Sequence, residues 1–150
     1  MTKPSGFRFG QHVIPERQVF FQTALSYAFT NIKPVVPGHI LVSPKRVVCR
    51  VAELTPQEAA DLMVCAHKIA PMLQKAYDSS SLTIAIQDGK DAGQSVAHVH
   101  MHVMPRKAGD FSNNDDVYHK LEKEDGNEGR LRSLEEMVME AEHLEKLLVQ

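Results

Sequence analysis

The sequence of 150 residues contains no tryptophan and only two cysteines, Cys49 and Cys65. Neither cysteine belongs to a C-x-x-C motif, which predicts reduced thiols in an intracellular protein rather than a disulfide framework. No apolar run approaches the roughly 20 residues that cross a bilayer. The first ten residues, MTKPSGFRFG, contain no apolar segment of the signal-peptide type. We therefore expect a cytoplasmic protein, with the nucleus as a second location, and no association with a membrane.

An excess of charge of one sign is also missing. The chain has 17 Lys and Arg residues against 19 Asp and Glu residues, for a formal net charge of −2. This balance gives no reason to expect binding to nucleic acid. The 43% of apolar residues are enough for a real core in a chain of this length. We predict one domain over residues 1–150.

Two segments carry the signals of helices. Thr55-Pro56-Gln57-Glu58 combines an N-cap, a proline at the first helical position and a capping box. Apolar residues follow at helical spacing as far as Leu73, and Pro71 within this pattern predicts a kink. A second capping box, from Ser133 to Glu136, predicts a C-terminal helix over residues 133–149.

Extended segments with alternating apolar and polar residues predict strands. They are Val19 to Phe21 with Leu25 to Asn31 as a hairpin, His39 to Val42, Ser81 to Gln87, and Val96 to Met104, which Pro105 should end. Strands, helix, strands and helix joined by short links favour an α+β fold with a mainly antiparallel sheet. The polar residues 112–130 predict a mobile loop, ordered at most around Val117 to Leu121.

Three histidines alternate with apolar residues in AHVHMHVM, residues 97–104. Because residues i, i+2 and i+4 of a strand point to one side, His98, His100 and His102 should share a face at a spacing of about 6.6–7 Å. The apolar residues between them should face the core. Three imidazoles are hard to place in an apolar core, since each ring nitrogen needs a partner. The pattern therefore favours a functional site.

Two kinds of site remain open from these residues. A His-x-His pair can bind zinc with a distant third ligand, such as His39, although no Cys or Glu lies nearby. Alternatively, one imidazole is a nucleophile and its neighbour donates to a leaving oxygen. The preceding Gly93-Gln94-Ser95-Val96 offers backbone N–H groups, an amide and a hydroxyl to phosphate oxygens, and Gln87 adds a further donor. These neighbours favour phosphoryl transfer.

Residues 98–104 match the H-φ-H-φ-H-φ-φ pattern of the histidine triad (HIT) superfamily, and the chain resembles its fragile histidine triad branch. The resemblance spans about residues 7–120 and also rests on Phe7 to His12, Lys33 to His39, Gln87 to Gly89 and Pro105 to Phe111. The Hint-type nucleoside phosphoramidases, another branch, continue after the triad with Gly-Gly-Arg and carry a Trp-containing tail. This sequence has neither feature.

The resemblance implies a HIT-like fold with a five-stranded antiparallel sheet, two main helices, and a homodimer in which two sheets join. It implies hydrolysis of diadenosine triphosphate to AMP and ADP through a covalent nucleotidyl-histidine. Mg²⁺ or Mn²⁺ would be bound mainly by substrate phosphates, with no metal site of the protein itself and no tightly bound zinc. Two alternatives stay open. One is a nucleotide-sensing module that signals in its substrate-bound form through partner proteins at residues 112–130, and the other is a Hint-like phosphoramidase.

The resemblance also assigns roles to single residues. His100 corresponds to the nucleophile, with its ring aligned by the backbone carbonyl of His98. His102 corresponds to the residue that contacts the α-phosphate and the scissile oxygen, and His98 and His39 to a supporting pair behind the nucleophile. The positions that correspond to substrate contacts are Gly93, Gln94, Ser95 and Val96 at the phosphates, Gln87 as a further nucleotide contact, Asn31 at the ribose, and Phe9, His12, Phe29 and Leu41 near the adenine.

Overall fold

The computed structural model describes residues 6–122 and 131–149. Its centre is a five-stranded antiparallel sheet with the strand order β3-β4-β5-β7-β6. The strands are β3 (Val19–Gln22), β4 (Ser26–Thr30), β5 (Ile40–Pro44), β6 (Ser81–Ile86) and β7 (Met101–Arg106). A separate hairpin of β1 (Gly6–Phe9) and β2 (His12–Pro15) precedes them. The α+β class and the five-stranded antiparallel sheet are therefore confirmed, and the homodimer stays a prediction.

Three α-helices accompany the sheet: α1 (Pro56–Ala76), α2 (Asp116–Glu122) and α3 (Leu134–Val149). Short 3-10 turns occur at η1 (Glu16–Gln18), η2 (Val51–Glu53) and η3 (Lys90–Ala92). Both predicted capping boxes form, at Thr55 with Glu58 and at Ser133 with Glu136. Helix α1 runs through Pro71 as one element. No helix among residues 6–122 and 131–149 is both long and apolar enough to span a membrane.

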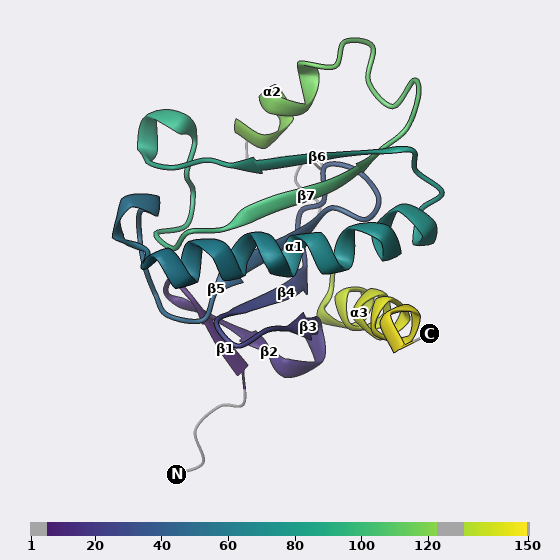
Figure 1. Cartoon of the computed structure of the whole chain (residues 1–150). Coiled ribbons are helices and arrows are strands. Elements are labelled where there is room, and N and C mark those ends of the chain that lie inside the picture. The colour runs from purple at the N-terminus through teal and green to yellow at the C-terminus, as the bar shows by residue number, and fades with distance from the viewer. Residues whose placement is uncertain (1–5, 123–130, 150) are drawn as a thin grey trace.

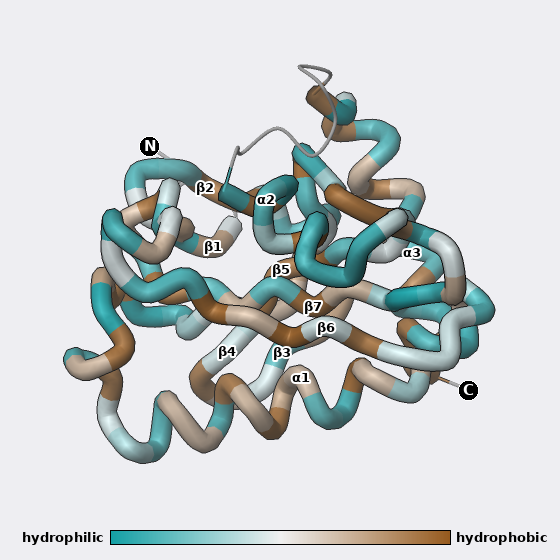
Figure 2. The backbone as a smooth tube through the Cα atoms, turned by 90° about the horizontal axis from the view of Figure 1, so that it is seen from above, coloured by the Kyte–Doolittle hydropathy of each residue, from teal (hydrophilic) through white to brown (hydrophobic). Residues whose placement is uncertain are grey.

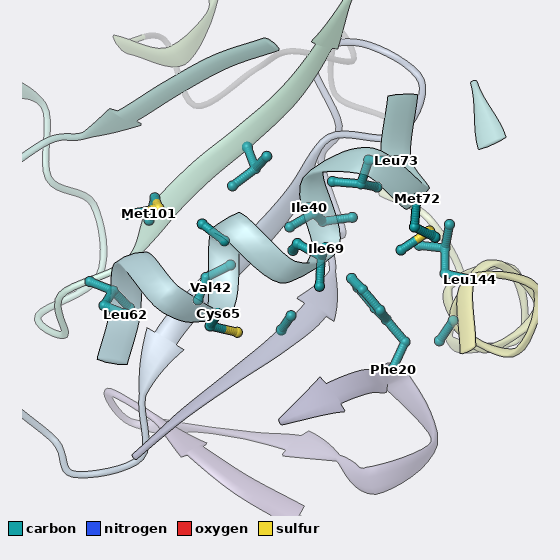
Figure 3. Packing of buried hydrophobic residues seen from close by; sticks show 14 of the residues in the cluster. Phe20, Ile40, Val42, Leu62, Cys65, Ile69, Met72, Leu73, Met101 and Leu144 are labelled. Atoms are coloured by element: carbon teal, nitrogen blue, oxygen red, sulfur yellow. The ribbon is translucent and has the colours of Figure 1, made fainter. Parts of the chain in front are cut away.

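The two faces of the sheet have different covers. Figure 1 shows α1 lying across one face, with α3 beside it at the β3 end. Figure 2 shows the β1–β2 hairpin and α2 on the opposite side of the sheet from α1. The core under α1 and α3 (Figure 3) includes Phe20, Ala28, Ile40, Val42, Leu62, Ile69, Leu73, Met101, Val103 and Leu144. Burial of these side chains is the main force that holds the helices on the sheet.

Alternate residues of the same strands face the hairpin. Tyr27, Phe29 and Leu41 pack with Phe9 and Ile14 in a second apolar cluster. Because side chains alternate along a strand, this face and the α1 face are built from neighbouring positions of β4 and β5. His102 pairs directly with Leu41 across the β5–β7 ladder, so it belongs to the hairpin face.

The expected strand over Val96 to Met104 is wrong at both ends. Strand β7 begins only at Met101, because the N–H groups of His98 and Val99 bond to the carbonyls of Val96 and Val48 instead of to a strand neighbour. The strand also continues past Pro105 to Arg106. Since the β5 partner ends opposite Val103, a missing N–H at Pro105 is tolerated there.

Residues 112–130, expected to be a loop with order at most around Val117 to Leu121, are helical at that place. Residues 116–122 form α2, whose Val117 and Leu121 are buried against Val36 and Met104. Two apolar anchors one helical turn apart are enough to hold this short, otherwise polar helix on the sheet. Residues 123–130 lie outside the described part of the chain.

Candidate active site

The first element of the site is a single hydrogen bond that orients His100. Its Nδ1 lies 2.7 Å from the backbone oxygen of His98, which can only accept. Nδ1 therefore carries the proton, and Nε2 keeps its lone pair. Burial lowers the pKa of His100, so the ring is neutral at neutral pH. The ring of Phe9 meets it edge-on, with centroids 5.1 Å apart, and limits its rotation. The arrangement presents an unprotonated nitrogen.

The second element is a relay through two further histidines. The N–H of Val35 donates to Nδ1 of His39 at 2.9 Å, so the proton of His39 is on Nε2. That Nε2 donates to Nδ1 of His102 at 2.9 Å, which in turn places the proton of His102 on Nε2. This last N–H is buried and has no partner among the described residues. His102 is thus a fixed hydrogen-bond donor.

Electrostatics keep this relay uncharged. Burial, helped by the neighbouring imidazoles, lowers the pKa of His39 to about 3 and that of His102 to about 2. A charged ring would have two N–H groups, and the bonds from Val35 to His39 and from His39 to His102 would each lose their acceptor. The neutral state and the hydrogen-bond directions therefore support each other.

His98 supports the site in a different way. Its Nδ1 accepts the N–H of Gly10 at 2.9 Å, and its Nε2 donates to the carbonyl of Pro44 at 2.8 Å. The ring therefore joins the β1–β2 turn to the end of β5, and only its backbone oxygen reaches the ring of His100. The expected pair behind the nucleophile is divided: His98 aligns His100 through the main chain, and His39 orients His102.

These rings lie at one end of a cavity of about 560 Å³, a size typical of small-molecule sites. The cavity lies on the hairpin face of the sheet and reaches α2 and the first turns of α3. It combines an apolar interior with a few polar groups. The lining residues include Phe9, Ile14, Gln18, Phe29, Asn31, Lys33, His39, Leu41, Gln87, Ser95, His100, His102, Lys120 and Met137.

Comparison with known proteins accounts for this combination of fold and histidines. The HIT domain matches residues 12–109, nearly two thirds of the chain. This chain belongs to the HIT family. A protein of Dictyostelium discoideum named bis(5'-adenosyl)-triphosphatase is 48% identical to it over 139 residues, which cover 93% of this chain and 91% of that protein.

Other HIT proteins are similar over most of the chain. A bis(5'-nucleosyl)-tetraphosphatase of the asymmetrical type from Schizosaccharomyces pombe is 53% identical over 117 residues, covering 78% of this chain and 63% of that protein. The crystal structure of the Caenorhabditis elegans NitFhit protein superposes with a TM-score of 0.80 at 43% identity. The match covers 98% of this chain but 31% of that one, so it corresponds to one part of a longer protein.

Most residues that the sequence nominated for the HIT site meet in the cavity. Those that line it are Phe9, His12, Phe29, Asn31, His39, Leu41, Gln87, Ser95, Val96, His100 and His102. His98 is behind it, as described above. Gly93 and Gln94 do not line it. The Gln94 amide accepts from the N–H of Gly89 and donates to the carbonyls of Cys49 and Val96, so its side chain shapes the loop instead.

Asn31 is held from two sides at the cavity wall. Its side-chain oxygen accepts the N–H of Lys33 at 3.0 Å, as in a turn. Its backbone oxygen accepts from Arg132 at 3.2 Å, and Arg132 also forms a half-buried ion pair with Glu140 of α3 at 2.9 Å. The C-terminal helix is therefore connected to the site through Arg132.

Several lining residues were missed from the sequence. Gln18, Lys120 and Met137 are far from the histidine motif in the chain, and each reaches the cavity only because η1, α2 and α3 pack around the sheet. No spacing or motif signals this. Arg132 was missed for the same reason, since an arginine in a polar segment is ordinarily solvated.

The described residues of the HIT site do not form a set of ligands for a metal ion. The residues that the structure describes contain no group of three or more His, Cys, Asp or Glu side chains able to hold an ion. Both nitrogens of His39 and Nδ1 of His100 and of His102 are engaged, and Nε2 of His102 carries a proton, so Nε2 of His100 is the one ring nitrogen of these three residues with a free lone pair. The residues present therefore do not fit a resident zinc ion.

Proposed function

We propose that this HIT protein hydrolyses dinucleoside polyphosphates such as diadenosine triphosphate, releasing AMP and ADP. The observation that carries the proposal is the bond from Nδ1 of His100 to the carbonyl of His98, which leaves Nε2 as a free nucleophile at the end of a nucleotide-sized cavity. The Dictyostelium relative bears the name of this activity along nearly its whole length. The length of the phosphate chain is left open, since the fission yeast relative is named for tetraphosphates.

The first step is displacement at the α-phosphorus. Nε2 of His100 forms a bond to phosphorus while the bond to the bridging oxygen breaks, and the electron pair of that bond leaves with ADP. The N–H of His102 donates to this oxygen as its charge grows, so the leaving group needs no proton. The enzyme then holds AMP on Nε2 of His100. Covalent catalysis in this way divides one difficult displacement into two easier ones.

The second step returns the enzyme to its starting state. Water attacks phosphorus, the bond from phosphorus to Nε2 breaks, and one proton passes to solvent as AMP is released. Throughout both steps Nδ1 of His100 keeps its proton against the carbonyl of His98, which stabilises the positive charge of the substituted ring. Ser95 and Gln87 line the cavity, and in this proposal their side chains contact phosphate oxygens.

Mg²⁺ or Mn²⁺ belongs to the proposal as part of the substrate. Triphosphates bind these hard cations through their oxygens, and the described residues supply no cage of carboxylates in their place. A metal bound to the phosphates would offset their negative charge when the substrate enters the cavity.

The proposal extends to a homodimer in the cytoplasm. Among the described residues β6 pairs only with β7, so it is an edge strand of the sheet, and its Ile84 is exposed. An open edge with an exposed apolar residue is a surface on which a second copy could continue the sheet. Sedimentation equilibrium would measure the mass in solution, and a monomer at all concentrations would contradict this part.

The test of the activity is a trapped intermediate. The enzyme is mixed with diadenosine triphosphate, and the reaction is quenched rapidly without acid. Mass spectrometry of the peptides should then find adenylate on His100. His100→Asn should bind substrate without turnover, and the exposed histidine change His67→Asn should leave the rate unchanged. Turnover by His100→Asn would overturn the mechanism. A higher kcat/KM on adenosine 5'-phosphoramidate than on diadenosine triphosphate would instead favour the phosphoramidase reading.

A further inference from the structure

Gln18 is a polar side chain at the far end of the cavity from the histidines, and the proposed chemistry does not use it. It is the last residue of η1, is 5% exposed, and lines the cavity. A glutamine buried to this degree needs partners for both its oxygen and its NH2 group. The neighbours of Gln18 therefore show which of its two polar groups has no partner in the protein.

The orientation of the Gln18 amide follows from its one hydrogen bond. The distance from its Nε2 to the backbone oxygen of Thr30 is 2.7 Å. Because a carbonyl only accepts, the NH2 group must face Thr30, and the reversed amide would set two oxygens against each other. Among residues 6–122 and 131–149, no hydrogen bond to Oε1 is found, and because Oε1 is not one of the fully buried atoms without a partner, it is accessible from the cavity. Gln18 thus offers the cavity a fixed acceptor.

The position of this acceptor follows from the sheet register. His102 pairs with Leu41, Leu41 with Phe29, and Phe29 with Val19, so these residues form one row across four strands. Three steps of about 4.8 Å place the start of β3 about 14 Å from His102. Gln18 directly precedes Val19. This span suits a nucleotide whose phosphate lies at the histidines and whose base lies over Phe29.

We infer that Gln18 selects the base of the bound nucleotide, with Oε1 accepting a hydrogen bond from the 6-amino group of adenine. A 6-oxo purine such as hypoxanthine would present an oxygen to Oε1. The amide cannot turn to donate instead, because its NH2 group is held by Thr30. The side chains that flank the base, Phe9, Ile14, Phe29 and Leu41, are apolar and cannot distinguish the two purines. The inference deepens the proposed function and rests on the nucleotide orientation that it gives.

The test compares AMP with IMP, which differ only in the purine. Isothermal titration calorimetry of the whole protein should give an affinity for AMP about 10- to 100-fold higher than for IMP, the usual effect of one satisfied against one opposed buried polar group. Gln18→Met, which keeps the volume but removes the amide, should lower the preference to about threefold or less. Gln22→Met, an exposed glutamine on β3, is the matched control and should keep the wild-type preference.

Steady-state kinetics provide the second measurement, with diadenosine and diinosine triphosphates. A base contact made equally before and during the reaction should alter KM and leave kcat unchanged. Equal affinity of the wild type for AMP and IMP, or a preference retained in Gln18→Met, overturns the role of Gln18. If Gln18→Met does not fold, Gln18→Leu replaces it. The ratio of the wild-type affinities for AMP and IMP tests the base preference without either variant. Absence of turnover with a clear AMP preference would overturn the proposed function and leave base selection standing.

Discussion

His39 offers the sharpest test of the relay, because it touches the reacting groups only through His102. His39→Leu removes two short buried hydrogen bonds, from the N–H of Val35 at 2.9 Å and to Nδ1 of His102 at 2.9 Å, and a longer contact from the Asn31 amide to Nδ1 at 3.5 Å. Each orphaned buried group costs about 1–3 kcal/mol, so the free energy of unfolding should fall by about 2–6 kcal/mol. Both bonds lie where His39 is 1% exposed, so water cannot replace them.

The same change should reduce turnover with little effect on binding. Without His39 the ring of His102 is free to turn and to exchange its proton between nitrogens. If the productive state falls to about a tenth, kcat falls about tenfold while KM stays nearly constant. His39→Gln should recover much of both losses, since its amide has an oxygen for Val35 and an N–H for His102.

Urea unfolding and steady-state hydrolysis of diadenosine triphosphate measure the two effects separately, with His67→Leu on the exposed side of α1 as the control. An unchanged kcat in His39→Leu would refute the relay. So would a His39→Gln protein as slow as His39→Leu, because the role would then require an imidazole and not the direction of two hydrogen bonds.

Three further outcomes are expected. Stability to urea should fall from pH 7 to pH 5, because the pKa values of His39 and His102 are lowered to about 3 and about 2 in the native state. Below about pH 6.5 the unfolded chain therefore binds more protons than the native protein. The free energy of unfolding then falls by up to about 1.4 kcal/mol per pH unit for each ring. A flat profile would contradict neutral native rings. Arg132→Met should destabilise by about 1–3 kcal/mol and raise KM, because it removes the ion pair of the half-buried Glu140 and the hydrogen bond to the backbone oxygen of Asn31 at the cavity wall. Breaking the exposed pair of Arg17 and Glu142 should cost less than about 1 kcal/mol. Equal effects of these two changes on stability and KM would contradict a role of Arg132 in the site. EDTA should slow hydrolysis but leave the melting temperature unchanged, since the described residues hold no metal-ligand set, and a lower melting temperature would indicate a resident metal.

Local signals predicted most elements because their physical causes are local. The capping boxes at Thr55 and Ser133 satisfy N–H groups within three residues, so they mark helix starts wherever the chain folds. Strands β4 and β5 were recognised by their short runs of apolar and small residues between turns, since both of their faces are buried. The start of β7 failed this reasoning, since alternation continues from Val96 while the backbone of His98 and Val99 bonds to a turn and to Val48.

Helix α2 shows the opposite failure. Its composition is polar and acidic, and propensity alone does not support a stable seven-residue helix. Two side chains, Val117 and Leu121, pack on Met104 and Val36, residues that are distant or on another element. Tertiary contact stabilises the segment, so the sequence could indicate local order around Val117 to Leu121 but not a stable helix.

The sequence by itself determined which residues could react. Three imidazoles at alternate positions, a glycine-rich approach and the HIT pattern identify His98, His100 and His102, since a strand-like segment fixes the relative direction of its neighbours. Only the tertiary structure decided what each ring does. The proton directions of His98 and His102 depend on partners far along the chain, Gly10 at 88 positions and His39 at 63 positions, whereas His100 is directed by the carbonyl of His98 two residues away. The fixed oxygen of Gln18 opposite the histidines depends in the same way on Thr30. Hydrogen-bond direction is a property of pairs of groups, and the fold chooses the pairs.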